Sequence, residues 1–143
     1  MGVPFESESQ RAAWERLRAP LEELFPGAVR ERIHAIGYVM TIGGTTVTST
    51  LVPRGDHDAT VANRVYLAGA VPMSEDLLRM LTRWNERRRF GFYGVDAEDN
   101  VYVEEQFVAS TLTTGILGAS IASVLASNTN HRDEVRAFGG GDL

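Results

Sequence analysis

The sequence contains no cysteine, no lysine and no long apolar run. Without cysteine there are no disulfides, no thiolate catalysis and no cysteine-ligated zinc, and a reducing cytoplasm is compatible with that composition. Residues 115–126 form the longest apolar-looking stretch, but Ser and Gly interrupt it and it is shorter than the roughly 20 apolar residues that span a bilayer. The first ten residues lack the apolar centre of a signal peptide. We therefore expect a cytoplasmic protein with no membrane partner.

The charge balance is acidic, with 14 basic residues, all of them arginine, against 19 acidic ones and a net charge of -5. A nucleic-acid-binding surface requires a basic face, so this balance argues against a nucleic-acid partner. The length of 143 residues predicts a single domain, 1–143, that is large enough to bury a core. From about residue 129 the chain becomes polar and then glycine-rich, which predicts a frayed tail.

Apolar periodicity predicts the order α-β-β-β-α-β-β-α. The helices are expected over residues 7–25, from the Ser74 cap to Arg89, and from the Thr114 cap to about residue 128. The strands are expected over 36–42, 46–51 and 60–70, with a hairpin over 90–103. Helices with one apolar stripe bury it against a sheet, so we predict an α+β two-layer sandwich with an antiparallel sheet.

Several local features accompany this prediction. Pro20 is expected to kink the first helix or to open a second short one. The polar residues 53–59 are typical of an exposed loop. The second helix is expected to bury one stripe, with Trp84 and Phe90 filling the junction between helix and sheet; the stripe consists of Leu77, Leu78, Leu81 and Trp84.

No recognisable catalytic or metal-binding set is present. His34, His57 and His131 are too far apart in sequence to form a close-spaced ligand motif. The loop that starts at Asp96 matches the first calcium-ligand positions but has Val101 and Phe107 where glycine and glutamate are required. The neighbouring carboxylates of residues 104–105 lie on a strand and point to opposite faces, so they cannot act as an acid–base pair. We predict no catalytic residue, metal or cofactor.

The hairpin carries aromatic residues on both of its faces. Phe92 and Tyr93 are adjacent on a strand, so their rings point in opposite directions. One layer of helices cannot cover both rings. We expect a second subunit or a bound peptide to cover the other face.

The second helix has the spacing Leu78-x-x-Leu81-x-x-Trp84-Asn85, and it is followed by Phe90-Gly-Phe-Tyr-x-Val-Asp and then Asn100-Val101. This pattern resembles the YbjN-like proteins and the related type III secretion chaperone-like domains. By order of elements the resemblance covers residues 36–128, and by motif only 81–103. It implies a compact, secretion-chaperone-like α+β domain, often dimeric, that binds peptides or partner proteins and has no enzymatic activity.

The leading hypothesis is thus a non-enzymatic, bacterial, cytoplasmic homodimer that binds an unidentified protein or peptide. The residues expected to form the core and the dimer seam are Leu78, Leu81, Trp84, Phe92 and Tyr93. Peptide contact is expected at the first helix and the open sheet face, through Trp14, Val47, Leu51 and Tyr66. The alternative is a small-molecule-binding protein or minor enzyme with a pocket between helix and sheet, lined by Tyr38, Arg64 and Tyr66.

Overall fold

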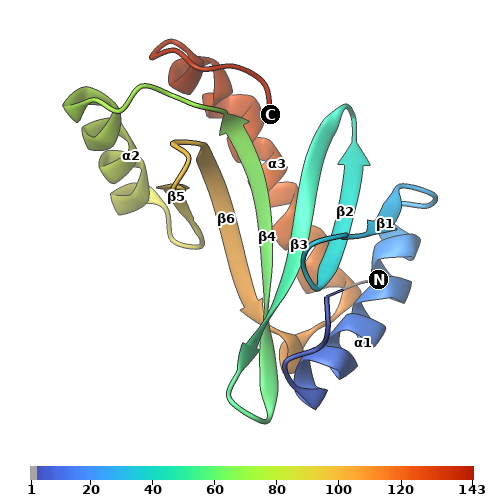
Figure 1. The fold of residues 1–143 in the computed structure, drawn as a ribbon. Helices are drawn as coiled ribbons and strands as arrows, with labels where there is room; N and C mark the ends of the chain where they lie inside the picture. The colour runs from blue at the N-terminus through green and yellow to red at the C-terminus, as the bar shows by residue number, and fades with distance from the viewer. Residues whose placement is uncertain (1–2) are drawn as a thin grey trace. The chain divides into compact units, whose positions relative to one another are not determined.

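The structure, a computed structural model, describes residues 3–143. The described chain has three α-helices and six strands in the order α1 (Glu8–Leu24), β1 (Val29–Glu31), β2 (Gly37–Ile42), β3 (Thr45–Arg54), β4 (Asp58–Ala68), α2 (Glu75–Arg87), β5 (Phe92–Val95), β6 (Val101–Val108) and α3 (Thr114–Arg136), with a short 3-10 turn (Ala109–Thr111) before α3 (Figure 1). The strands form one antiparallel open sheet in the order β1-β2-β3-β4-β6-β5. The predicted fold class is confirmed. Strand β1 was not predicted, because three residues are too few to show an alternating pattern.

The chain divides into two compact units, each assembled from two separate segments. The first unit comprises residues up to Asn63 together with Gln106–Ala122, and the second comprises Arg64–Glu105 together with Ser123–Leu143. In sequence the change from one unit to the other falls within β4, β6 and α3.

In the first unit the helices share one face of the sheet. Tyr38 and Ser49 are register partners on β2 and β3 and therefore lie on the same face. The Tyr38 hydroxyl donates to the Trp14 carbonyl of α1 at 2.8 Å, its ring stacks on the Trp14 ring, and its burial raises the pKa of Tyr38 to about 12. Ser49 is hydrogen-bonded to Asn63, whose amide donates to Ser120 of α3 at 2.9 Å. Helices α1 and α3 thus cover the same side of these strands.

In the second unit α2 lies alongside the edge strand β5 (Figure 1). The Trp84 ring packs on the Tyr93 ring with centroids 5.0 Å apart, and His131 of α3 lies 4.1 Å from Trp84. The Asn85 amide donates to the Tyr93 carbonyl at 2.9 Å, and its oxygen accepts from the Tyr93 N–H at 2.7 Å. Asn85 therefore satisfies the backbone groups that a neighbouring strand would otherwise pair.

The helix starts follow the predicted capping with one difference. Ser7 and Ser74 accept hydrogen bonds from the backbone N–H groups of Gln10 at 3.1 Å and Leu77 at 3.2 Å, as N-caps do. Helix α3 is capped by Thr113 rather than Thr114, since the Thr113 hydroxyl accepts from the Ile116 N–H at 3.0 Å.

Two segments are more regular than the sequence predicts. Helix α1 continues through Pro20 as one helix to Leu24. The exposed loop predicted over residues 53–59 is shorter than expected, because β3 runs to Arg54 and β4 begins at Asp58, which leaves an exposed turn over residues 55–57. The Asp58 carboxylate accepts from the N–H groups of Ser110 at 3.1 Å and Ala59 at 2.8 Å. Hydrogen bonding from Ser110, with that from Ala59, lowers the pKa of Asp58.

The end of the chain also differs from the prediction of a tail that frays from about residue 129. Helix α3 continues to Arg136, and Val135 in its last turn is buried. The polar side chains that suggested a tail occupy the exposed side of the helix, at Arg132, Asp133 and Glu134. Beyond the helix, Gly141 forms an antiparallel bridge with Gly69.

Candidate functional site

The outer face of α2 carries an open groove of about 700 Å³, which we call the α2 groove; it is lined by Met73, Ser74, Glu75, Leu78, Arg79, Thr82, Arg83 and Glu86. Leu77 and Leu81 are buried, as the periodicity predicts, but Leu78 is 47% exposed. The prediction that Leu78 is buried was wrong, because one residue along a helix is a turn of about 100° and carries Leu78 away from the Leu77–Leu81 side. The groove therefore combines exposed apolar surface with charges of both signs, and Arg79 pairs with Glu75 at 2.5 Å.

Phe90 does not lie where the sequence predicts. Its side chain is 75% exposed, so it does not fill the junction between α2 and the sheet. Trp84, by contrast, packs against Tyr93 and His131.

A second group of residues occupies the face of the sheet opposite α2 and α3 in the second unit; we call it the sheet-face cluster, and it consists of Arg64, Tyr66, Phe92, Tyr102 and Glu104. Phe92 is paired with Glu104 across β5 and β6, whereas Tyr93 is paired with Val103. Since Tyr93 packs against Trp84 and His131 of the helices, the rings of Phe92 and Tyr93 point to opposite faces, as predicted.

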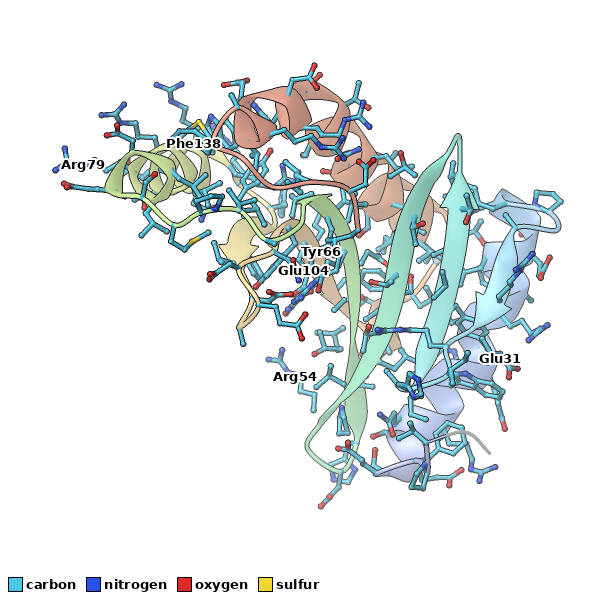
Figure 2. All side chains as sticks on the ribbon, turned by 45° about the horizontal axis from the view of Figure 1, so that its top comes forward. Glu31, Arg54, Tyr66, Arg79, Glu104 and Phe138 are labelled. Atoms are coloured by element: carbon cyan, nitrogen blue, oxygen red, sulfur yellow. The ribbon has the colours of Figure 1, made fainter. Side chains whose placement is uncertain are left out.

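The sheet-face cluster is organised around the Arg64 guanidinium. Its carbon lies 3.6 Å from the centre of the Tyr102 ring, Nε donates to Glu104 at 2.8 Å and Nη1 donates to the Tyr66 hydroxyl at 3.1 Å. Figure 2 shows Tyr66 and Glu104 next to each other on this part of the sheet. Burial would lower the pKa of Arg64, but the hydrogen bonds with Tyr66 and Glu104 outweigh it and raise that pKa. Arg64 therefore stays charged and holds Glu104, which is itself buried.

On this face of the sheet, a glycine of β5 lies opposite an aromatic residue of β6. Gly94 is paired with Tyr102, and a Cβ added at Gly94 would lie 2.5 Å from the Tyr102 hydroxyl. The Tyr102 ring thus lies across the bare backbone of β5, with the Arg64 guanidinium near its ring and the Phe92 ring against it at 6.1 Å. The site is a pre-formed aromatic and cationic surface.

A small cavity of about 270 Å³ lies beside α2, lined by Trp84, Arg87, Arg88, Tyr93 and His131. Arg88 is held there from several sides, since it hydrogen-bonds Ser127, donates to Ser123 at 3.1 Å and pairs with Glu105 at 3.3 Å. Glu104 and Glu105 therefore serve different arginines on opposite faces, which agrees with the prediction that they cannot form an acid–base pair. Burial raises the pKa of Tyr93 in the same region.

The residues predicted to contact a peptide fall into two groups. Val47 and Leu51 are fully buried between β3 and the helices, so in this structure they offer no surface to a partner. Their strand presents Thr48 and Val52 on the other face instead. Trp14 and Tyr66 are partly exposed, Trp14 against Phe5 and Tyr38, and Tyr66 in the sheet-face cluster.

The pocket expected for a small-molecule ligand is not formed by the predicted residues. Tyr38 is fully buried against Trp14, whereas Arg64 and Tyr66 bind each other in the second unit. The cavity beside Trp84 was missed, because Arg88 and His131 are far from each other in sequence. Within residues 3–143, no three or more His, Asp or Glu side chains are grouped closely enough to hold a metal ion.

None of the helices in residues 3–143 has the length and apolar character to cross a bilayer.

Comparison with solved structures finds the fold among secretion chaperones. The "ExsC-ExsE Complex" structure matches with a TM-score of 0.67 at 15% identity, covering 90% of this chain and 96% of the other. The Yersinia pestis type III secretion chaperone SycH, in complex with a fragment of YscM2, matches with a TM-score of 0.57 at 15% identity, covering 86% and 98%. At this identity the likeness concerns the fold alone.

Comparison of the sequence with known proteins gives the family. No curated protein matches the chain. Residues 28–137 match the family model YbjN, described as "Putative bacterial sensory transduction regulator". The match covers most of the chain and includes α2, the sheet-face cluster and the cavity beside Trp84. The chain belongs to the YbjN family.

Proposed function

We propose that this protein is a non-enzymatic, cytoplasmic protein-binding module that acts as a homodimer and holds a segment of another protein. The observation that carries the proposal is the exposed apolar surface of the α2 groove, where Leu78 and Met73 face solvent on an otherwise polar helix. Exposed apolar surface bordered by polar residues is typical of protein interfaces. The two structural neighbours, ExsC with ExsE and SycH with a fragment of YscM2, are each complexes with a protein partner, which supports the same class of function.

The α2 groove is proposed as the dimer seam. Two-fold dimers bring the same surface of both copies together, so an interface must be complementary to itself. The groove offers Leu78 between carboxylates and guanidiniums of the same helix, Glu75 and Glu86 with Arg79 and Arg83. Leu81 and Trp84 lie on the inner side of α2, and the Trp84 ring packs on Tyr93 of β5.

The sheet-face cluster is proposed as the partner-binding surface. Tyr66, Phe92 and Tyr102 present rings around a fixed guanidinium, and aromatic and arginine side chains carry much of the energy of protein interfaces.

Sedimentation velocity at micromolar concentration tests the dimer. The wild-type chain is expected to sediment as a dimer and Leu78→Glu as a monomer, because the new carboxylate would be buried at the seam. Ile33→Glu, which alters an exposed apolar residue of the first unit, is the matched control and should remain dimeric. A wild-type monomer contradicts the dimer.

Affinity capture from the native cytoplasm, followed by mass spectrometry, tests partner binding. A protein is expected with the wild-type chain and with Ile33→Ala, and it should be lost with Tyr66→Ala. The alternative function, binding of a small molecule, is favoured by the cavity beside Trp84. Recovery of a metabolite and no protein would support small-molecule binding and contradict the proposal that the chain is a protein-binding module.

A further inference from the structure

Residues 139–143 pass the end of β4 and form a single antiparallel bridge there, between Gly141 and Gly69. The Gly69 N–H donates to the Gly141 carbonyl at 2.8 Å, and the Gly141 N–H donates to the Gly69 carbonyl at 3.0 Å. This reciprocal pair of bonds is the hydrogen-bonded pair of an antiparallel ladder. The backbone of β4 therefore has a pairing edge at Gly69, and residues 139–143 occupy it.

The edge accepts a strand that is nearly bare of side chains. A Cβ added at Gly140 would lie 2.5 Å from the Gly69 carbonyl oxygen, and one added at Gly139 would lie 2.9 Å from the Pro72 ring. Both glycines also have positive φ, +83° and +115°, which side chains disfavour. Two small residues are thus required immediately before the paired residue.

The two residues after Gly141 make side-chain contacts with the second unit. Arg136 is fixed by its Nε, which donates to the Leu67 carbonyl of β4 at 3.0 Å, and its Nη2 pairs with the Asp142 carboxylate at 2.7 Å. Leu143 lies over Gly69, since a Cβ on Gly69 would approach the Leu143 Cγ to 2.9 Å. The edge therefore has a cation beside the first position after the paired glycine and a glycine surface beneath the second, which suit an acidic residue and an apolar residue.

The occupying segment is held weakly. The Asp142 side chain is 84% exposed and Leu143 is 71% exposed, so neither contributes much burial. Exposed ion pairs contribute little to stability, and glycines lose more conformational freedom on ordering than other residues. The contacts that hold the segment are the two backbone hydrogen bonds with Gly69, the Asp142–Arg136 ion pair and the Leu143 side chain over Gly69.

We propose that the backbone edge at Gly69 is a docking site for a short segment of a partner protein, and that residues 139–143 are its displaceable internal occupant. The inference rests on the proposed function as a protein-binding module. The partner segment has the chemistry of the occupant: two small residues, a glycine, an acidic residue for Arg136 and an apolar residue over Gly69. Because the occupant is tethered, it competes at a high effective concentration, so a partner segment must bind better than the occupant does.

The test uses the full chain with the occupant released. Gly141→Pro removes the N–H that donates to Gly69, and Asp142→Arg places a second cation beside Arg136. The probe is a fluorescent, acetylated synthetic peptide with the sequence of residues 137–143. We expect the double variant to bind the probe saturably, and the wild-type chain to bind it at least tenfold more weakly because its edge is occupied.

Hydrogen exchange at the Gly69 amide reports the edge directly. Exchange should be at least tenfold faster in the double variant than in the wild type and should slow again when the probe is added. A probe with lysine in place of the aspartate is the matched control and should bind about two- to fivefold more weakly, because the ion pair with Arg136 is exposed. Adding Arg136→Gln to the double variant should remove that preference.

Three results would overturn the proposal. In the first, the double variant unfolds at the wild-type temperature but does not bind the probe. In the second, the aspartate and lysine probes bind equally well. In the third, protection of the Gly69 amide from exchange in the wild type depends on protein concentration. The last result would identify the occupant as the segment of a second copy. If partner capture succeeds while the probe fails, only this docking site is excluded. If the probe binds and capture yields no protein, only the proposed function fails.

Discussion

Arg64 shows how one side chain can organise a surface. Its guanidinium is placed near the Tyr102 ring, joined to the Tyr66 hydroxyl and paired with the buried Glu104 carboxylate. The pair stabilises the folded state only as long as both charges are present, because a charge left buried without its partner is costly.

Arg64→Leu is therefore expected to lower the free energy of unfolding by about 2–3 kcal/mol. Arg64→Leu/Glu104→Leu should be less destabilised than Arg64→Leu alone, since it leaves no buried carboxylate facing an apolar side chain. Urea denaturation of the two single variants, the double variant and the wild type measures the coupling. Additive effects of the two substitutions would show that the pair is not coupled.

Asp96 controls the turn between β5 and β6. Its carboxylate accepts from the N–H groups of Glu98 at 2.9 Å and Asn100 at 3.0 Å, and from the Asn100 amide at 3.0 Å. Burial would raise the pKa of Asp96, but the hydrogen bonds from Asn100 and Glu98 outweigh it and lower that pKa. These bonds lie on either side of Asp99, which stands between Glu98 and Asn100 in the turn and has a φ of 61°.

The lowered pKa predicts how stability depends on pH. Because the folded-state pKa lies below the unfolded one, the Asp96 contribution is fully present above about pH 4 and is lost as the pH falls through the folded pKa. Asp96→Asn should be less stable than the wild type at pH 6, and the difference should shrink at pH 3. Urea midpoints at the two pH values measure it, and a constant difference would exclude this linkage.

At the scale of elements, hydrogen bonds from two asparagine side chains fix how the helices pack on the sheet. Asn85 of α2 closes the outer edge of β5 by bonding both backbone groups of Tyr93. Asn63 of β4 joins Ser49 of β3 to Ser120 of α3 in a buried polar network. Buried polar groups of this kind are costly when unpaired, so each device favours a single arrangement of its elements.

Asn85→Ala is expected to destabilise the chain by about 1–3 kcal/mol, since it removes two hydrogen bonds and leaves the Tyr93 backbone groups unpaired. Amide exchange at Tyr93 should rise together with the loss of stability. Arg89→Ala, at an exposed residue just beyond the same helix and outside the α2 groove, is the control and should change stability little. Unchanged Tyr93 exchange would show that Asn85 does not protect this edge.

Ser120→Ala removes the hydroxyl that accepts from the Asn63 amide. We expect a loss of about 1–3 kcal/mol, because the Asn63 donor stays buried without that partner. Asn63→Ala/Ser120→Ala should cost less than the sum of the two single changes. Thermal unfolding of the four proteins checks this, and strict additivity would argue against a network.

At the scale of the whole molecule, the proposed dimer links stability to concentration. A dimer that dissociates on unfolding has a midpoint temperature that rises with protein concentration. The wild-type midpoint should rise over a hundredfold increase in concentration, whereas that of Leu78→Glu should stay constant. Differential scanning calorimetry at the two concentrations measures this, and a constant wild-type midpoint would contradict the dimer.

The sequence by itself determined the α+β class, the starts of α1 and α2 and the opposite directions of Phe92 and Tyr93. Those features depend on periodicity, capping and the two-residue repeat of strands, which are local. The tertiary structure alone decided that Glu104 meets Arg64, that Arg88 meets Glu105 and Ser127, and that Leu78 remains exposed. It also decided that Gly141 pairs with Gly69 where a frayed tail was expected. These contacts join residues far apart in the chain, and no local pattern specifies which distant partner a buried charge or an open strand edge will meet.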